Sequence, residues 1–135
     1  MATILAHITI REGSERAFEA LAAELHASTH ATEDNVLAYG YWRAAEPRHY
    51  YTVLAFPDFL SFIAHQTSEH HETASPELGR FIESIRLEWV DPIAGASTLG
   101  ATERQEAPAD ADELTQRYAV RFAAQIADWW LPLRQ

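Results

Sequence analysis

The stretch VLAYGYWRAAEPRHYYTVLAF, residues 36–56, contains the clearest signal for the fold of this chain. Its two halves are rich in aromatic, aliphatic and β-branched residues, a composition that favours strands. A short connection around Pro47 separates the halves, and such connections join antiparallel neighbours. The sequence therefore predicts a β-hairpin of strands 36–45 and 49–56, and with it an antiparallel sheet.

The segments on either side complete a β-α-β-β-α-β order. Residues 3–10 form an apolar, β-branched run typical of a strand, and apolar residues at helical spacing predict a helix over 15–30. After the hairpin, the sequence predicts a short helix beginning at Pro57, a helix over 69–84 and a strand over 85–93. This order predicts the α+β ferredoxin-like fold, a four-stranded antiparallel sheet with helices on one face.

Alternation along each strand assigns side chains to the two faces of the sheet. The face under the helices is expected to hold every second residue of the first two strands: Ile4, Ala6, Ile8, Ile10, Ala38, Gly40 and Trp42. The opposite face then holds His7, Tyr39, Tyr41 and Arg43. The third strand contributes to the helix side either Tyr51, Val53 and Ala55, or Tyr50, Thr52 and Phe56, and alternation alone leaves both open.

The face away from the helices would expose a large apolar patch that includes Leu37, Tyr39, Tyr41 and Leu54. Packing of two sheets would bury it. We therefore expect a homodimer in which two copies form a dimeric α/β barrel.

The chain beyond the sheet divides into two parts. Residues 94–109 are small and polar with Pro and Gly, which predicts a linker after a domain of residues 1–93. Residues 110–135 carry an amphipathic pattern that predicts a helix over about 110–130. That helix could pack on its own core, swap onto a dimer partner or close a pocket.

Composition excludes several kinds of chemistry. Among the 135 residues there is no cysteine, and all 10 basic residues are arginine, so thiolate and lysine Schiff-base chemistry are excluded. The net charge of −10 argues against nucleic acid and anionic membrane partners. No apolar run approaches the length of a membrane span, and a soluble cytoplasmic protein is expected.

Histidines concentrate in HQTSEHHETAS, residues 65–75. Helical geometry places His70 and His71 on either side of the buried stripe of their helix, pointing apart, so we expect no shared metal. His65 falls away from the apolar stripe of the preceding helix and is expected to be exposed. His26 and His30, spaced i, i+4, are expected on a solvated face because they lack the glutamate of a zinc-binding HExxH motif.

The order of elements and the segment FPDFLSFIAHQTSEHHETA, residues 56–74, resemble the antibiotic biosynthesis monooxygenase family. The shared pattern is a third strand that ends in an aromatic (Phe56), a helix, and then Ser68 and His70 at the start of the next helix. The resemblance covers residues 1–93 and implies a dimeric α/β barrel with its active site between sheet and helices. Haem-degrading members carry an asparagine on the first strand where this chain has Ala6 or His7, so haem is not expected.

The resemblance implies a cofactor-independent, metal-free monooxygenase that oxidises a small aromatic substrate (phenol, hydroquinone or polyketide-like) with O2. His70 is expected to act as the base, since imidazole titrates near neutral pH. Trp42, Phe56, Tyr51 and His71 are expected to contact the substrate. The alternative is a non-catalytic dimeric binding or stress-response module for a small hydrophobic ligand.

Overall fold

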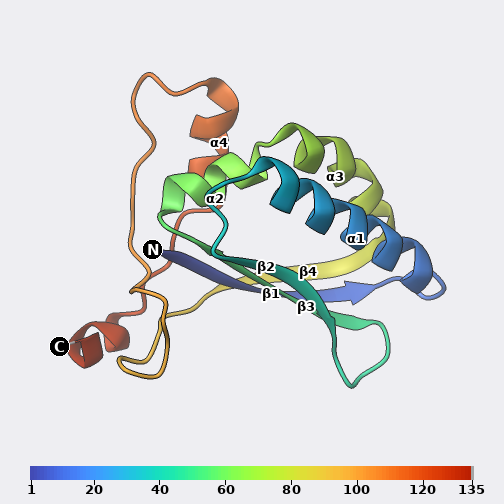
Figure 1. Ribbon diagram of the computed structural model, residues 1–135, viewed down its shortest axis with the longest axis horizontal. Helices are drawn as coiled ribbons and strands as arrows, with labels where there is room; N and C mark the ends of the chain where they lie inside the picture. The colour runs from blue at the N-terminus through green and yellow to red at the C-terminus, as the bar shows by residue number, and fades with distance from the viewer. Residues whose placement is uncertain (135) are drawn as a thin grey trace.

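The computed structural model describes residues 1–134 and contains the ferredoxin-like α+β fold (Figure 1). A four-stranded antiparallel sheet in the order β2-β3-β1-β4 carries helices on one face. In chain order the elements are β1 (Ala2–Ile10), α1 (Glu15–Thr32), β2 (Ala38–Arg43), β3 (His49–Phe56), α2 (Phe59–Gln66), α3 (Glu69–Phe81), β4 (Ile82–Trp89), α4 (Glu113–Arg121) and a 3-10 helix, η1 (Asp128–Arg134). The sheet of residues 1–134 is open and forms no closed barrel.

The predicted order of sheet elements is confirmed, with small shifts at their ends. Asp58, rather than Pro57, precedes α2 and caps it: its carboxylate accepts a hydrogen bond from the Ser61 amide at 2.7 Å. β4 begins earlier than expected because Ile82 pairs with Ile10, next to an irregularity in β1 after Thr9. No helix within residues 1–134 is both long and apolar enough to cross a membrane.

The expected facing of β2 is wrong. Tyr39 and Tyr41 lie under the helices, and Tyr39 is only 6% exposed. Arg43 faces α1, where it donates two hydrogen bonds, of 2.7 and 2.6 Å, to the Glu19 carboxylate. Trp42 is 53% exposed on the opposite face, with its ring close above Gly40, where a Cβ would lie 3.2 Å from it. The indole of Trp42 lies so close to Gly40 that a side chain at this position would crowd the ring. The glycine does not serve to leave space between the sheet and the helices.

Pairing between strands settles the alternative that alternation left open on β3. Tyr39 pairs with Leu54 and Tyr41 with Thr52, so the even-numbered residues of β3 share the helix side. On β1, the expected residues Ile4, Ala6, Ile8 and Ile10 are all buried. His7 lies on the opposite face as expected, where its ring packs edge-on against Tyr51, 5.5 Å between centroids.

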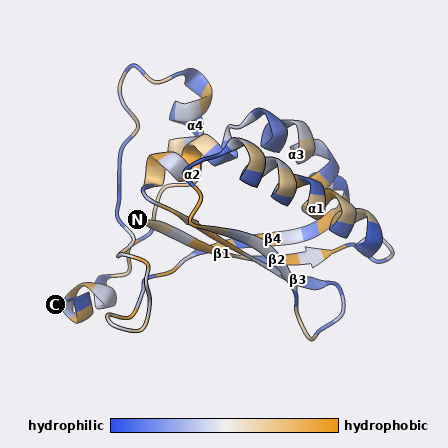
Figure 2. Cartoon of the chain, viewed as in Figure 1, coloured by the Kyte–Doolittle hydropathy of each residue, from blue (hydrophilic) through white to orange (hydrophobic). Residues whose placement is uncertain are grey.

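An aromatic core lies between α2 and the sheet. Phe56, Phe59 and Phe62 are each no more than 2% exposed, and Phe62 packs edge-on against Trp89 with 5.5 Å between ring centroids. Figure 2 shows hydrophobic residues concentrated along α2, whereas hydrophilic residues mark the outer turns of α1 and α3. α2 is therefore buried on more than one side.

The expected single C-terminal helix over 110–130 is wrong: α4 ends at Arg121, and η1 begins at Asp128. α4 lies beside α2, with Phe122 packed edge-on against Phe62 at 6.0 Å between centroids (Figure 1). The chain leaves the helix after Phe122 because Ala124 is buried in the core. A straight helix would carry the following residues away from the domain.

η1 is held by one ion pair, which gives a first prediction. Arg134 donates hydrogen bonds of 2.8 and 2.6 Å to the Asp91 carboxylate and one of 2.9 Å to the Thr102 carbonyl. This guanidinium and the Thr102 amide hold the pKa of Asp91 below its usual value against the opposing effect of burial. Arg134→Ala should speed amide hydrogen exchange in residues 128–134 and leave the sheet protected.

Hydrogen exchange followed by mass spectrometry measures this change. The matched control is Arg117→Ala, which removes an arginine of α4 that is 61% exposed and lies 4.0 Å from Glu113. Unchanged exchange in residues 128–134 of the Arg134 variant would show that this ion pair does not hold η1.

Candidate active site

A cleft of about 610 Å³ lies between the sheet and the helices. Its apolar wall comes from all four strands and from α1, α3 and α4, and includes Ala6, Ile8, Phe18, Leu54, Leu78, Leu87 and Phe122. Its polar groups include Tyr39, Tyr41, Thr52, His65, His71 and Arg121. An apolar cleft with a few polar groups is the usual form of a small-molecule site.

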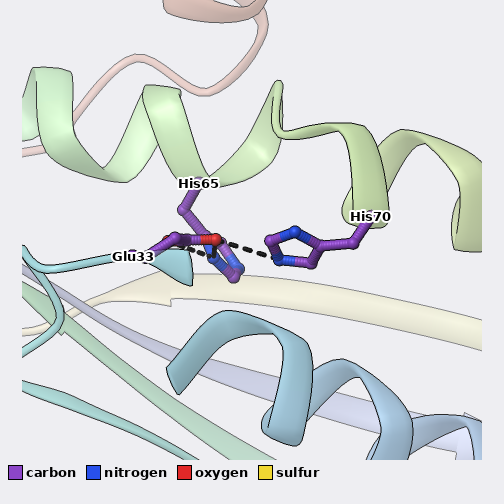
Figure 3. Close-up of side chains that lie close together, drawn as sticks. All are labelled: Glu33, His65 and His70. Carbon is purple, nitrogen blue, oxygen red and sulfur yellow. Dashed lines mark hydrogen bonds and ion pairs between the residues drawn. The ribbon is translucent and has the colours of Figure 1, made fainter. Parts of the chain in front are cut away.

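Three side chains from different elements converge beside this cleft (Figure 3). Nδ1 of His65 lies 3.0 Å from both carboxylate oxygens of Glu33, to which its N–H donates. Nε2 of His70 lies 3.0 Å from Oε1 of the same carboxylate. We call Glu33, His65 and His70 the triad.

Local structure fixes each member of the triad. Glu33 is the C-cap of α1, and its backbone N–H donates to the Thr29 carbonyl, where the helix ends and the chain continues toward β2. His65 lies in the last turn of α2, and Ser68 caps α3, with its hydroxyl donating to the His65 carbonyl at 2.8 Å. The tight turn between α2 and α3 therefore sets His65 and His70 on either side of the Glu33 carboxylate.

The cleft contains polar atoms that are buried without a partner. Within residues 1–134 these atoms include Nε2 of His65, Nδ1 of His71 and Oγ1 of Thr52, all on residues that line the cleft. Buried polar atoms are normally hydrogen-bonded, so unpaired ones gathered in one cleft mark places where a ligand or a water molecule can bind. His65 is 1% exposed, and because its Nδ1–H points to Glu33, its Nε2 carries a free lone pair.

The neighbouring groups are neutral at physiological pH. Burial is the main cause that lowers the pKa of His71 from 6.5 to about 4. Burial also raises the pKa of Tyr39 and of Tyr41. The two phenol oxygens lie 2.7 Å apart, so one hydroxyl donates to the other and the second can donate into the cleft.

The lowered pKa of His71 makes stability depend on pH. Between about pH 6.5 and 4 the unfolded chain binds a proton at this position that the folded chain does not. Stability therefore falls on acidification through this window, by up to about 3 kcal/mol. His71→Leu should remove much of that loss.

Urea unfolding at pH 7 and pH 5 tests this prediction, with His26→Gln as a control because His26 is exposed. The wild type and the control should lose stability between the two pH values, and His71→Leu should lose clearly less. An equal loss in all three proteins would mean that His71 does not contribute.

The expected site residues do not all meet in the cleft. His71 lines it, but His70 does not; Nε2 of His70 lies instead 3.0 Å from the Glu33 carboxylate and 3.1 Å from the Thr29 hydroxyl. Trp42 and Tyr51 pair with each other on the face of the sheet that points away from the helices. Both therefore lie outside the cleft. Phe56 is 1% exposed and packs behind His65, at 5.3 Å between ring centroids.

Sequence reasoning missed His65 and Glu33. The expectation of an exposed His65 is wrong: its ring packs edge-on against Tyr39 and His71, at 5.0 and 5.2 Å between centroids. The spacing contained one signal for the burial of His65. This residue follows the apolar Phe62 by three positions, so the two side chains share one side of α2. Glu33 carried no signal, because it follows a helix in a polar turn.

The chain forms an open ferredoxin-like domain with a cleft between its sheet and its helices. The chain belongs to the antibiotic biosynthesis monooxygenase family, whose model matches residues 1–77. No curated relative matches the chain. The triad and His71 lie inside the matched part, whereas α4, which walls one side of the cleft, lies beyond it.

Solved structures confirm the fold. PA3566 from Pseudomonas aeruginosa is 21% identical over 66% of this chain and 90% of its own, with a TM-score of 0.61. Rv0793 from Mycobacterium tuberculosis is 18% identical over 71% of this chain and 98% of its own, with a TM-score of 0.64. A structure described as an antibiotic biosynthesis monooxygenase is 21% identical over 69% of this chain and 99% of its own, also with a TM-score of 0.64.

Proposed function

We propose that this protein is a cofactor-independent monooxygenase that oxidises a small phenol, hydroquinone or polyketide-like aromatic with O2. The observation that carries the proposal is the buried Nε2 of His65, which is unpaired among the described residues while Glu33 holds the other ring nitrogen. Family membership supports the class of reaction. His65, rather than His70, is then the base.

The first step is proton transfer from the substrate hydroxyl to Nε2 of His65. The Glu33 carboxylate accepts a hydrogen bond from Nδ1 and stabilises the imidazolium that forms, as carboxylates do in hydrolase triads. His70 acts as a positioning residue, because its Nε2 lies 3.0 Å from the same carboxylate.

The substrate anion then reduces O2. One electron passes to O2, and the substrate radical and superoxide combine to form a C–O bond. The peroxide takes the proton back from His65. Loss of the hydrogen on the same carbon, with cleavage of the O–O bond, gives a carbonyl and water. For a phenol the balance is phenol plus O2 to quinone plus water.

The walls of the cleft suit this chemistry. Apolar side chains exclude water from the anion and the peroxide. The Tyr39 and Tyr41 hydroxyls can donate a hydrogen bond to a developing oxyanion, because burial keeps both phenols protonated. His71 would contact the substrate as a neutral imidazole.

The opposite face of the sheet supports a homodimer. Trp42 and Tyr51, paired across β2 and β3, are 53% and 41% exposed in the single chain. A second copy would cover these rings and could complete a dimeric barrel. Their place is then at the interface between copies, not at the substrate.

Oxygen consumption by chelator-treated protein tests the proposal, with a panel of phenols, hydroquinones and anthrones and with 18O2 to label the product. We expect one O2 consumed per product and one labelled oxygen in the new carbonyl. Tight retention of an aromatic without oxygen uptake would contradict the proposal and favour a binding module.

A further inference from the structure

A second hollow, of about 740 Å³, lies on the other side of the triad, between α1 and α3. Glu33 and His70 line it, together with Thr32, Ser68 and three further acids, Glu24, Glu69 and Glu77. His65 lines the cleft instead. The triad therefore separates an acidic outer hollow, which attracts cations, from the apolar cleft.

The triad has the composition of a transition-metal site. One ring nitrogen of His65, one of His70 and a Glu33 oxygen all lie within 4.8 Å of one another, and the nitrogens that face the carboxylate are Nδ1 of His65 and Nε2 of His70. Two imidazoles and one carboxylate bind zinc and other first-row divalent ions, with ligand bonds of about 2.0–2.2 Å.

The surroundings of His70 point to a cation as well. Three oxygens crowd its Nε2: Glu33 Oε1 at 3.0 Å, Thr29 Oγ1 at 3.1 Å and Ser68 Oγ at 3.3 Å. A single N–H can be directed at only one of them. A metal ion would interact favourably with the carboxylate and could take a hydroxyl or water as a fourth ligand.

We propose that Glu33, His65 and His70 bind one divalent first-row transition-metal ion, such as Zn²⁺, which enters from the outer hollow and inhibits the base. A metal on Nδ1 takes the lone pair of that nitrogen, so the single proton of the neutral imidazole moves to Nε2. Nε2 of His65 then donates and cannot accept a substrate proton. Metal binding follows from the triad alone, whereas inhibition rests on the proposed function.

Titration calorimetry of the full chain with Zn²⁺, after treatment with a chelator, tests the site. We expect one ion per chain, with binding weakened at least 100-fold in Glu33→Gln and in His70→Gln. The control is His26→Gln, which breaks a separate pair of histidines whose rings lie 4.3 Å apart on α1. Loss of binding in the control, or equal binding in all variants, would overturn the proposal.

Co²⁺ gives a readout that does not depend on variants. We expect visible absorption bands of a low-symmetry, nitrogen-ligated ion in the wild type and in His26→Gln, and the spectrum of aqueous Co²⁺ in Glu33→Gln. Circular dichroism confirms that each variant is folded. An aqueous spectrum with folded wild-type protein would contradict the site.

Oxygen consumption with one equivalent of Zn²⁺ tests the inhibition. We expect at least a tenfold loss of rate, restored by chelator. Zn²⁺ that binds at the triad without slowing turnover would overturn the inhibition but not the site. Failure of the proposed function is distinct, because then no substrate supports oxygen uptake even without metal, while calorimetry still detects the ion.

Discussion

Replacing His65 with glutamine is expected to slow oxygen consumption by roughly 10²–10⁴-fold, the usual contribution of a general base. Glutamine fills similar space but cannot accept a proton at neutral pH. His70→Gln should cost much less, roughly tenfold, because His70 only helps to position Glu33. The measurement is kcat and KM for oxygen uptake with each folded variant, and His26→Gln serves as the control.

The two histidine variants separate the two assignments of the base. A base at His70, as the sequence suggested, predicts the larger loss in His70→Gln. Full activity in His65→Gln would remove His65 from the mechanism, whatever the effect of His70.

Replacing Phe62 with alanine is expected to destabilise the domain by about 3–5 kcal/mol. Phe62 is 1% exposed and contacts the core on one side, at Trp89, and α4 on the other, at Phe122. Loss of the Phe62 ring would leave a cavity that borders both the core and α4. The amides of α4 should therefore also lose protection from hydrogen exchange.

Urea unfolding measures this cost. The control is Val120→Ala on α4, which is 80% exposed and should change stability by no more than about 0.5 kcal/mol. A loss below about 1 kcal/mol for Phe62→Ala would show that α4 does not depend on this contact.

The fold could be predicted because its signals are local. Alternating apolar residues marked the strands, helical spacing marked α1, and the short hairpin around Pro47 fixed the antiparallel order. The facing of β2 could not be predicted in this way. It depends on Trp42 lying across Gly40 and on Arg43 reaching Glu19, contacts that alternation does not contain.

The site was harder to predict because it depends on packing between distant segments. A helical wheel assumes one buried side, but His65 is enclosed by Tyr39 and Phe56 of the sheet and by His71 of α3. Glu33 lies 32 residues before His65 in the sequence. The two side chains meet because the end of α1, which carries Glu33, lies next to His65 in the folded chain. The histidine-rich stretch lies beside the cleft, but its most buried member, His65, was expected in solvent.

The most direct test of the account is the protonation state of His65. Nitrogen-15 NMR of the imidazoles, compared with His65→Gln for assignment, distinguishes a protonated Nδ1 from a protonated Nε2. We expect a proton on Nδ1, held by Glu33, and a bare Nε2 whose resonance shifts when a phenol enters the cleft. A proton on Nε2 in the metal-free protein, or a resonance that no aromatic ligand shifts, would contradict it.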